Sequence, residues 1–176
     1  MDYRRAYQKG GCYFFTVVTQ ARRPLLTQPD TLVRLREAFR RVRWKMPFQT
    51  DAIVILPDHL HCVWRLPPGD DDFSGRWKRI KHYVSVILPT GEVSASRQAK
   101  REKAVWQRRF WEHLLRDEED WRRHMDYVHY NPVKHGYVGR PVEWLFGSFP
   151  KAVKMGWYDE NWGAEEPTSV RGMDYE

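Results

Sequence analysis

Apolar and polar residues alternate along the first third of the chain in a pattern that predicts three β-strands. The run from Cys12 to Thr19 is rich in aromatic and β-branched residues, which favour strands. Two further runs, residues 48–56 and 60–66, are separated only by Pro57-Asp58, a pair typical of tight corners. We therefore expect the second and third strands to be antiparallel neighbours.

Three other stretches repeat their apolar residues at helical spacing. The first helix is expected over residues 29–45, the second from the acidic turn at residues 70–72 to about Leu88, and the third from Asp117 onward. Residues 89–103 contain small and charged residues and predict a long mobile loop. The strand-like pattern returns over residues 105–115, which predicts a fourth strand.

The end of the third helix is ambiguous because of Pro132. Proline lacks the backbone N–H that a helix interior needs, and it disfavours helical geometry at the residue before it. The helix is therefore expected to kink or restart, with Asn131 as the N-cap of a short second helix that stops at Gly136. A capping asparagine uses a side-chain oxygen that a nearby metal ion would share or compete for.

The length of the chain indicates one domain, and its charge and aromatic content favour nucleic-acid binding. A chain of 176 residues is long enough for one domain with a real core. It carries a net charge of +7 together with nine Trp and nine Tyr. Cations neutralise phosphates and flat rings stack on unpaired bases, so this combination suits nucleic acid, although a generic basic protein has a similar composition.

The same composition bears on where the protein works. No apolar run approaches the ~18 residues of a membrane span, and no signal-peptide pattern follows Met1. Cys12 and Cys62 lie inside apolar runs, which suits buried thiols in a reducing compartment better than a disulfide. We expect a cytoplasmic protein with no membrane partner.

The third strand carries the first candidate chemistry. Residues two apart on a strand point to the same side, so His59 and His61 share one face while Leu60 and Cys62 share the other. Two neutral imidazoles at this spacing can hold one divalent metal ion. The alternative is two exposed histidines on an edge strand.

The third predicted helix carries the second group of candidate catalytic residues. Tyr127 and Asn131 are four residues apart and lie on one helix face if the helix persists that far. Tyr130 lies one turn from Tyr127 and competes with it as a nucleophile. Lys134 is placed either to touch phosphate or to be an ordinary surface lysine.

Several motifs occur together along the chain. They are Tyr3-Arg4-Arg5, Gly10-Gly11, Phe14-Phe15-Thr16, Leu56-Pro57-Asp58-His59-Leu60-His61, Asp71-Asp72-Phe73-Ser74, Arg109-Phe110-Trp111-Glu112-His113 and the run Asp126-Tyr127-Val128-His129-Tyr130-Asn131-Pro132-Val133-Lys134-His135-Gly136. His-x-His alone is a weak signal, but the ordered set is specific. In this order the motifs resemble the REP-associated tyrosine transposases, relatives of the single-tyrosine HUH transposases of bacterial insertion sequences, and the resemblance covers about residues 3–150.

The resemblance implies a role for each candidate residue. His59 and His61 would bind a divalent metal ion, Mg²⁺ or Mn²⁺, and Tyr127 rather than Tyr130 would be the nucleophile. Asn131 is a candidate third metal ligand, where related insertion-sequence enzymes carry glutamine. His129 is expected to be structural, and His113 is left out of the metal shell.

The resemblance also implies a fold and a reaction. The expected fold is α+β, with a ferredoxin-like, RNA-recognition-type antiparallel sheet and helices mainly on one face. Residues 1–140 would form the transposase domain, and residues 141–176 a tail that is partly irregular or disordered.

The expected reaction is the cutting and joining of single-stranded DNA at REP-type hairpins through a 5′-phosphotyrosine, with a monomer favoured over a homodimer. Two alternatives remain at this point. The same fold could hold structured DNA or RNA without cutting it, or it could form a metal hydrolase that uses water.

Overall fold

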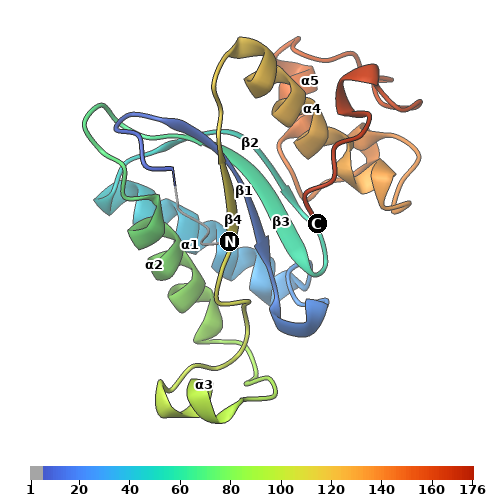
Figure 1. Ribbon diagram of the computed structural model, residues 1–176. Coiled ribbons are helices and arrows are strands. Elements are labelled where there is room, and N and C mark those ends of the chain that lie inside the picture. The colour runs from blue at the N-terminus through green and yellow to red at the C-terminus, as the bar shows by residue number, and fades with distance from the viewer. Residues whose placement is uncertain (1–5) are drawn as a thin grey trace.

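The fold is centred on one four-stranded antiparallel sheet. The computed structural model describes residues 6–176, so residues 3–5 of the sequence motifs lie outside it. The strands are β1 (Cys12–Val18), β2 (Gln49–Ile55), β3 (His59–Arg65) and β4 (Trp111–Leu114), in the spatial order β2-β3-β1-β4 (Figure 1). Every neighbouring pair is antiparallel, which confirms the predicted α+β class and the β2–β3 hairpin.

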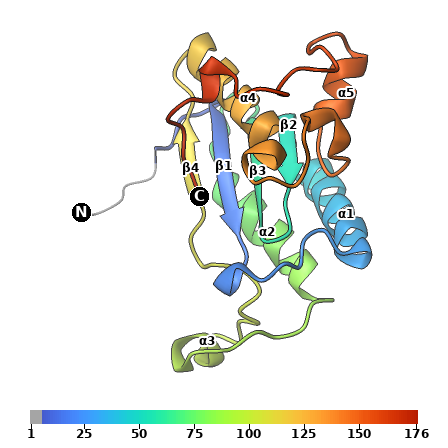
Figure 2. The same cartoon turned by 90° about the vertical axis from the view of Figure 1, so that its right-hand side faces the viewer.

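Helices cover both faces of this sheet. α1 (Pro29–Lys45) and α2 (Phe73–Ser85) pack together on one face, as the resemblance implied for most helices. α4 (Glu118–Lys134) covers the other face (Figures 1 and 2). The remaining helices are short: η1 (Gln20–Arg22), α3 (Ala95–Ala99), η2 (Pro141–Glu143), α5 (Phe149–Lys154) and η3 (Thr168–Val170).

The face that α1 and α2 cover holds the larger hydrophobic core. The odd-numbered residues of β1 point into it, and so do Leu60, Cys62 and Trp64 of β3. The Trp64 ring stacks on Trp77 of α2, with ring centroids 4.4 Å apart. Both cysteines are free thiols.

The fourth strand is shorter than the sequence pattern predicted. Only Trp111–Leu114 of the expected run over residues 105–115 pairs with β1. The residues before it contact the end of β1 through single interactions, such as the Gln107 N–H that donates to the Val18 carbonyl. Apolar content alone therefore overestimated the strand. The predicted loop over residues 89–103 also contains α3.

The predicted helix break at Pro132 is wrong, because α4 continues through it to Lys134. Asn131 is fully buried inside this helix and is not an N-cap. The helix ends at Lys134, and Gly136 follows two residues later with a φ of +72°, which suits the Gly136-to-Val133 and Tyr137-to-Pro132 backbone hydrogen bonds of a helix C-terminus. Packing of this last turn against the sheet outweighs the single backbone hydrogen bond that proline removes.

Residues 141–176 follow an irregular path over the α4 side of the sheet. Asp126 of α4 fixes this segment at two points, since its carboxylate accepts hydrogen bonds from Tyr158 at 2.7 Å and Ser169 at 2.6 Å. This tail was expected to be partly irregular or disordered, but its last residues pack here, with Val170 and Met173 buried. The domain boundary at residue 140 stays a prediction.

Among residues 6–176, no helix is both long and apolar enough to cross a membrane.

Candidate active site

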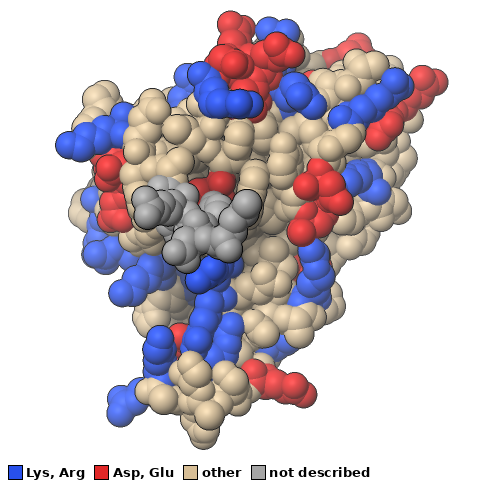
Figure 3. Space-filling view, in the orientation of Figure 1, with Lys and Arg blue, Asp and Glu red and all other residues tan. Residues whose placement is uncertain are grey.

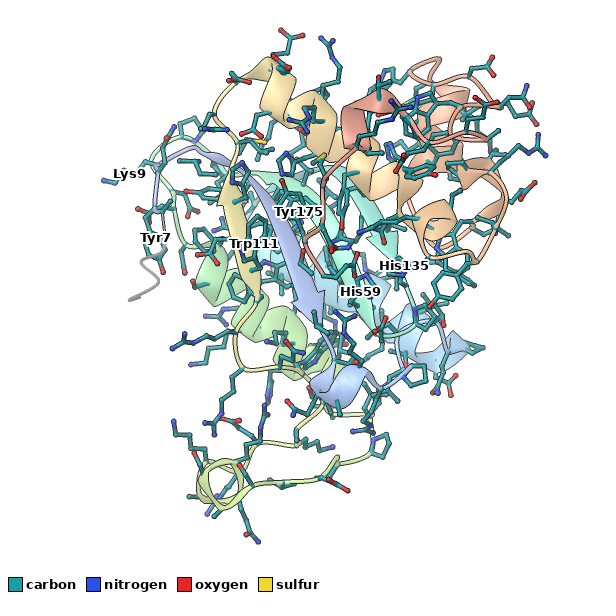
Figure 4. The ribbon with its side chains drawn as sticks, turned by 45° about the vertical axis from the view of Figure 1, so that its right-hand side comes forward. Tyr7, Lys9, His59, Trp111, His135 and Tyr175 are labelled. Carbon is teal, nitrogen blue, oxygen red and sulfur yellow. The ribbon has the colours of Figure 1, made fainter. Side chains whose placement is uncertain are left out.

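His59 and His61 lie on β3 and point toward α4. β3 is an interior strand, and the two side chains are 1% and 0% exposed, so they are not surface histidines of an edge strand. The His61 ring lies 5.3 Å from the ring of Tyr127, and the His59 ring lies 5.2 Å from that of His135. Figure 4 labels His59 and His135, which lie close together. One chain therefore brings the histidine pair and the tyrosine helix together.

A second set of residues orients each imidazole through its Nδ1 atom. His59 Nδ1 contacts Asp58 Oδ1 at 2.7 Å, and His61 Nδ1 contacts Thr16 Oγ1 at 2.9 Å. Burial alone would raise the pKa of Asp58, but hydrogen bonds from His59 and Arg22 outweigh it and lower that pKa. An ionised Asp58 fixes the proton of His59 on Nδ1 and leaves the Nε2 lone pair for a metal ion.

Three buried atoms at this site lack a hydrogen-bond partner within the described chain. They are Nε2 of His59, Nε2 of His61 and Oδ1 of Asn131. Unpartnered buried polar atoms are costly, and imidazole nitrogen and amide oxygen are both metal ligands. The residues predicted as ligands therefore have the chemistry and the free atoms that a divalent ion requires.

Tyr127 is held in a buried, hydrogen-bonded position on α4. Its hydroxyl donates to Glu176 Oε1 at 3.0 Å and accepts from Lys134 Nζ at 3.2 Å and from the Tyr175 backbone N–H at 3.2 Å. Burial, followed by the charge of Glu176, raises the pKa of Tyr127 to about 12, although Lys134 and Tyr175 act in the opposite direction. The phenol is therefore neutral in this arrangement.

Glu176 occupies the centre of the site. Its carboxylate lies 3.0 Å from His59 Nε2, 3.5 Å from His61 Nε2 and 3.1 Å from His135 Nε2. Burial would raise the pKa of Glu176, but the close approach of His135, His59 and His61 outweighs it and holds that pKa well below its usual range. Ligand atoms of His59, His61 and Glu176 all lie within 4.8 Å of one another, so these residues form a candidate metal group.

His59 and His61 contact the Glu176 carboxylate without donating a hydrogen bond to it. Burial lowers the pKa of His61 to about 4, so this imidazole is neutral near pH 7. The two Nε2 contacts to Glu176 also lack the geometry of hydrogen bonds. We therefore consider Glu176 an anion placed among groups that would also receive a metal ion or the oxygens of a phosphate.

The remaining sequence candidates are separate from this cluster or at its border. The buried ring of His129 contacts Ser148 at 3.1 Å and holds α4 to the segment before α5, which fits the structural role predicted for it. His113 pairs with Asp120 at 2.9 Å on another part of α4. Tyr130 is only partly buried and packs against the apolar cluster beneath α4.

Sequence reasoning missed Glu176, Thr16 and His135. Glu176 lies 49 residues after Tyr127 in an irregular segment, and no periodicity connects the two. Thr16 was visible in a predicted strand and in the Phe14-Phe15-Thr16 motif, but neither gave it a contact with His61. The β1–β3 register places it opposite His61, and that register was not predicted.

Comparisons with known proteins give a consistent result. The family described as transposase IS200 like matches residues 8–131. A Haemophilus influenzae protein described as a REP-associated tyrosine transposase is 43% identical over 174 residues, covering 97% of this chain and 98% of the relative. The REP-associated tyrosine transposase of Escherichia coli K12 is 42% identical over 164 residues, covering 93% of this chain and 92% of the relative.

A solved structure agrees with these sequence relatives. It is that of a REP-associated tyrosine transposase bound to a REP hairpin, and it is 39% identical to this chain with a TM-score of 0.79, covering 99% of both chains. The identities exceed what a shared fold alone requires, and they extend over nearly the whole chain. The chain therefore belongs to the REP-associated tyrosine transposases of the IS200-like transposase family.

Proposed function

We propose that this protein is a metal-dependent single-strand DNA endonuclease and strand transferase that uses Tyr127 as its nucleophile on REP-type hairpin DNA. The observation that carries the proposal is the position of the Tyr127 hydroxyl. It lies in one buried polar cluster with Lys134 and with the Glu176 carboxylate, which contacts both His59 and His61. The hairpin substrate is inferred from the solved relative, which was determined with a REP hairpin bound.

The reaction exchanges one phosphodiester bond for another. The Tyr127 oxygen bonds to phosphorus, the bond from phosphorus to the 3′-oxygen breaks, and the departing oxygen takes a proton to become a 3′-hydroxyl. The 5′-phosphotyrosine that remains conserves the bond energy, so another 3′-hydroxyl reverses the step and joins strands. The Tyr127 proton passes to solvent, because the phosphate displaces the Glu176 carboxylate that now accepts it.

This chain's own residues have separable tasks in that reaction. Lys134 donates to the Tyr127 oxygen and stabilises negative charge on it. Asp58 and Thr16 orient the two imidazoles. His59, His61 and a third ligand, Asn131 or Glu176, would hold the divalent ion, for which we propose Mg²⁺ or Mn²⁺. When bound, that ion neutralises charge on the scissile phosphate.

Glu176 competes with the substrate in this proposal. A phosphate oxygen that reaches Tyr127 needs the donors that now contact the Glu176 carboxylate, Lys134 and His135. Displacement of this side chain also removes one of the causes that raise the pKa of Tyr127. DNA entry would thus exchange the Glu176 carboxylate for the scissile phosphate beside the Tyr127 hydroxyl.

The active form is proposed to be a monomer, because a single chain supplies both the histidines and the tyrosine. A mixture of the His59→Ala/His61→Ala variant with Tyr127→Phe tests this point. If sites were shared between subunits, the mixture would regain activity. We expect none.

The decisive experiment is the search for a covalent adduct. Wild-type protein is mixed with a labelled REP hairpin carrying single-stranded flanks, in Mg²⁺ or Mn²⁺, and the adduct peptide is identified by mass spectrometry. We expect the phosphate on Tyr127, loss of the adduct in Tyr127→Phe, and retention in the matched control Tyr130→Phe.

Other outcomes would favour the alternatives. Binding of the hairpin with no adduct in the wild type would identify a protein that holds structured nucleic acid without cutting it. Cleavage that persists in Tyr127→Phe would identify a metal hydrolase that uses water.

A further inference from the structure

A second concave surface lies far from Tyr127 in the fold, on the side of the sheet that α1 and α2 cover. It is a cavity of about 760 Å³ between α2 and the segment that contains α3 and residues 100–110. No residue of the histidine cluster lines it. We call it the α2–α3 cavity. In Figure 3, Lys and Arg side chains gather between the main body and the lobe that carries α3.

The charge of this cavity is strongly one-sided. Its lining includes one acidic residue, Glu102, and seven basic ones: Lys78, Lys81, Arg97, Lys100, Arg101, Lys103 and Arg108. The whole chain has a net charge of only +7, so a large part of the excess positive charge is concentrated around one hollow. Such a surface attracts an anion that carries several charges.

Some of these cations build the wall. Arg97 donates to the Trp106 carbonyl and to Gln20 Oε1, the latter at 2.8 Å. Arg108 pairs with Glu102 at 3.0 Å, and Lys103 donates to two carbonyls at the end of α2. These contacts fix the shape of the cavity and neutralise Glu102.

Three other cations are not used in this way. Among residues 6–176, the side chains of Lys78, Lys100 and Arg101 make no hydrogen bond or ion pair, and all three are exposed. Exposed like charges around one hollow repel one another, and phosphate groups would relieve that repulsion. These three residues are therefore the ones that we expect to contact a ligand.

The cavity also presents an aromatic ring to its occupant. Tyr7 lines it with 53% of its surface exposed, and its ring is supported by stacking on Phe73, with centroids 5.0 Å apart. A base can stack on such a ring without sequence preference. A hollow of about 760 Å³ accepts about one or two nucleotides.

The cavity is connected to the catalytic side by a short path. Gln20 bonds to Arg97 in the cavity wall, and its neighbour Thr19 donates from its backbone N–H to the Asp58 carbonyl at 2.8 Å. Asp58 in turn contacts His59. Residues 19–20 thus separate the cavity from the end of β3 where the histidine pair begins.

We propose that the α2–α3 cavity binds unpaired DNA that flanks the hairpin, with Lys78, Lys100 and Arg101 on its phosphates and Tyr7 against a base. This inference rests on the proposed function, because it takes the ligand to be the unpaired part of the same DNA. It assigns that part of the substrate to the face of the sheet opposite Tyr127.

The test compares two labelled oligonucleotides, a REP hairpin alone and the same hairpin with single-stranded flanks, by equilibrium binding at several salt concentrations. The variant is Lys78→Gln/Lys100→Gln/Arg101→Gln. Its control is Arg36→Gln/Lys45→Gln/Lys154→Gln, which removes the same charge from exposed residues that do not line this cavity. Thermal unfolding checks that both variants remain folded.

We expect the cavity variant to bind the flanked hairpin about 10- to 100-fold more weakly, with the slope of log affinity against log salt reduced by about 2. Its affinity for the bare hairpin should change no more than that of the control variant. An equal loss for both oligonucleotides, or no loss for either, would overturn the proposal.

The adduct assay distinguishes this failure from failure of the proposed function. If the wild type forms the Tyr127 adduct while the cavity variant binds both DNAs like the control, only the cavity inference fails. If the flank-dependent loss occurs but no adduct forms, the cavity inference stands and the cleavage function fails.

Discussion

The two faces of the sheet differ in chemistry although the same strands supply both. On the α1–α2 face, β3 contributes Leu60, Cys62 and Trp64 to an apolar core. On the α4 face the same strand contributes His59 and His61, which are as deeply buried as the apolar residues. The period-two geometry of a strand allows one face to stabilise the fold while the other is used for a reaction.

The energetic cost of buried polar groups is larger on the α4 face, although the indole N–H groups of Trp64 and Trp77 in the α1–α2 core also lack a partner among the described residues. Buried polar groups lose their hydration, and those without partners destabilise the folded state. The α4 face contains several such groups, including Nε2 of both histidines and Oδ1 of Asn131. Stability should therefore come mainly from the α1–α2 face, and sensitivity to pH and ions from the α4 face.

The largest expected effect tests the first half of that statement. Trp64→Ala removes a fully buried ring stacked on Trp77 and should lower the free energy of unfolding by about 3–5 kcal/mol. His61→Ala, three residues away on the other face, should lower it by less than about 2 kcal/mol. Urea unfolding measures both, and equal losses would contradict the comparison.

The second-largest expected effect is a loss of unfolding free energy in acid, which arises on the α4 face. Burial lowers the pKa of His129 to about 3, whereas an unfolded histidine titrates near ~6.5. Below pH ~6.5 the unfolded chain binds a proton that the folded chain does not, so stability is full above that pH and falls until about pH 3. This one group should contribute about 1.4 kcal/mol per pH unit within the window.

His129→Gln isolates this contribution. Glutamine can still reach Ser148 but does not titrate, so the slope of unfolding free energy against pH between 6 and 4 should become smaller. Hydrogen exchange at pH 5 should show α4 opening before α1 and α2. Loss of protection in α1 first would contradict the assignment of acid sensitivity to the α4 face.

The smallest effect concerns the ion-dependent part of the same face. Glu176→Gln removes the only acidic side chain in the candidate metal group, so Mn²⁺ should bind about tenfold more weakly in calorimetry without DNA. With DNA the sign should reverse, because the phosphate no longer competes with a carboxylate, and adduct yield at saturating Mn²⁺ should rise. A fall in both quantities would make Glu176 a ligand needed during the reaction.

Local patterns predicted the parts of this structure that depend on neighbouring residues. The alternation around His59 and His61 placed both imidazoles on one face, and the spacing of Tyr127 and Asn131 placed both on one side of a helix. The sheet and the first two long helices followed from the same periodicities. Each of these inferences needed only a few adjacent residues.

What could not be predicted depends on contacts between distant residues. Pro132 argued locally for a break, yet packing of α4 on the sheet kept the helix intact. Glu176 reaches Tyr127 only because Asp126 fixes the intervening segment. The α2–α3 cavity likewise requires residues 97–110 to fold back on α2, which no pattern in that charged stretch indicated.

Asp126 anchors residues 141–176, and this anchor determines how strongly the Glu176 carboxylate competes with DNA for the site beside Tyr127. Ser169 is bonded to Asp126, and Glu176 follows it by seven residues, so this carboxylate can move no further than about 25 Å from its anchor. A group on so short a tether has an effective concentration in the ~mM range. Free DNA at micromolar concentration would lose to it. A strand that is already held elsewhere on the protein acquires a comparable local concentration of its own, so cleavage would favour DNA that engages two surfaces at once.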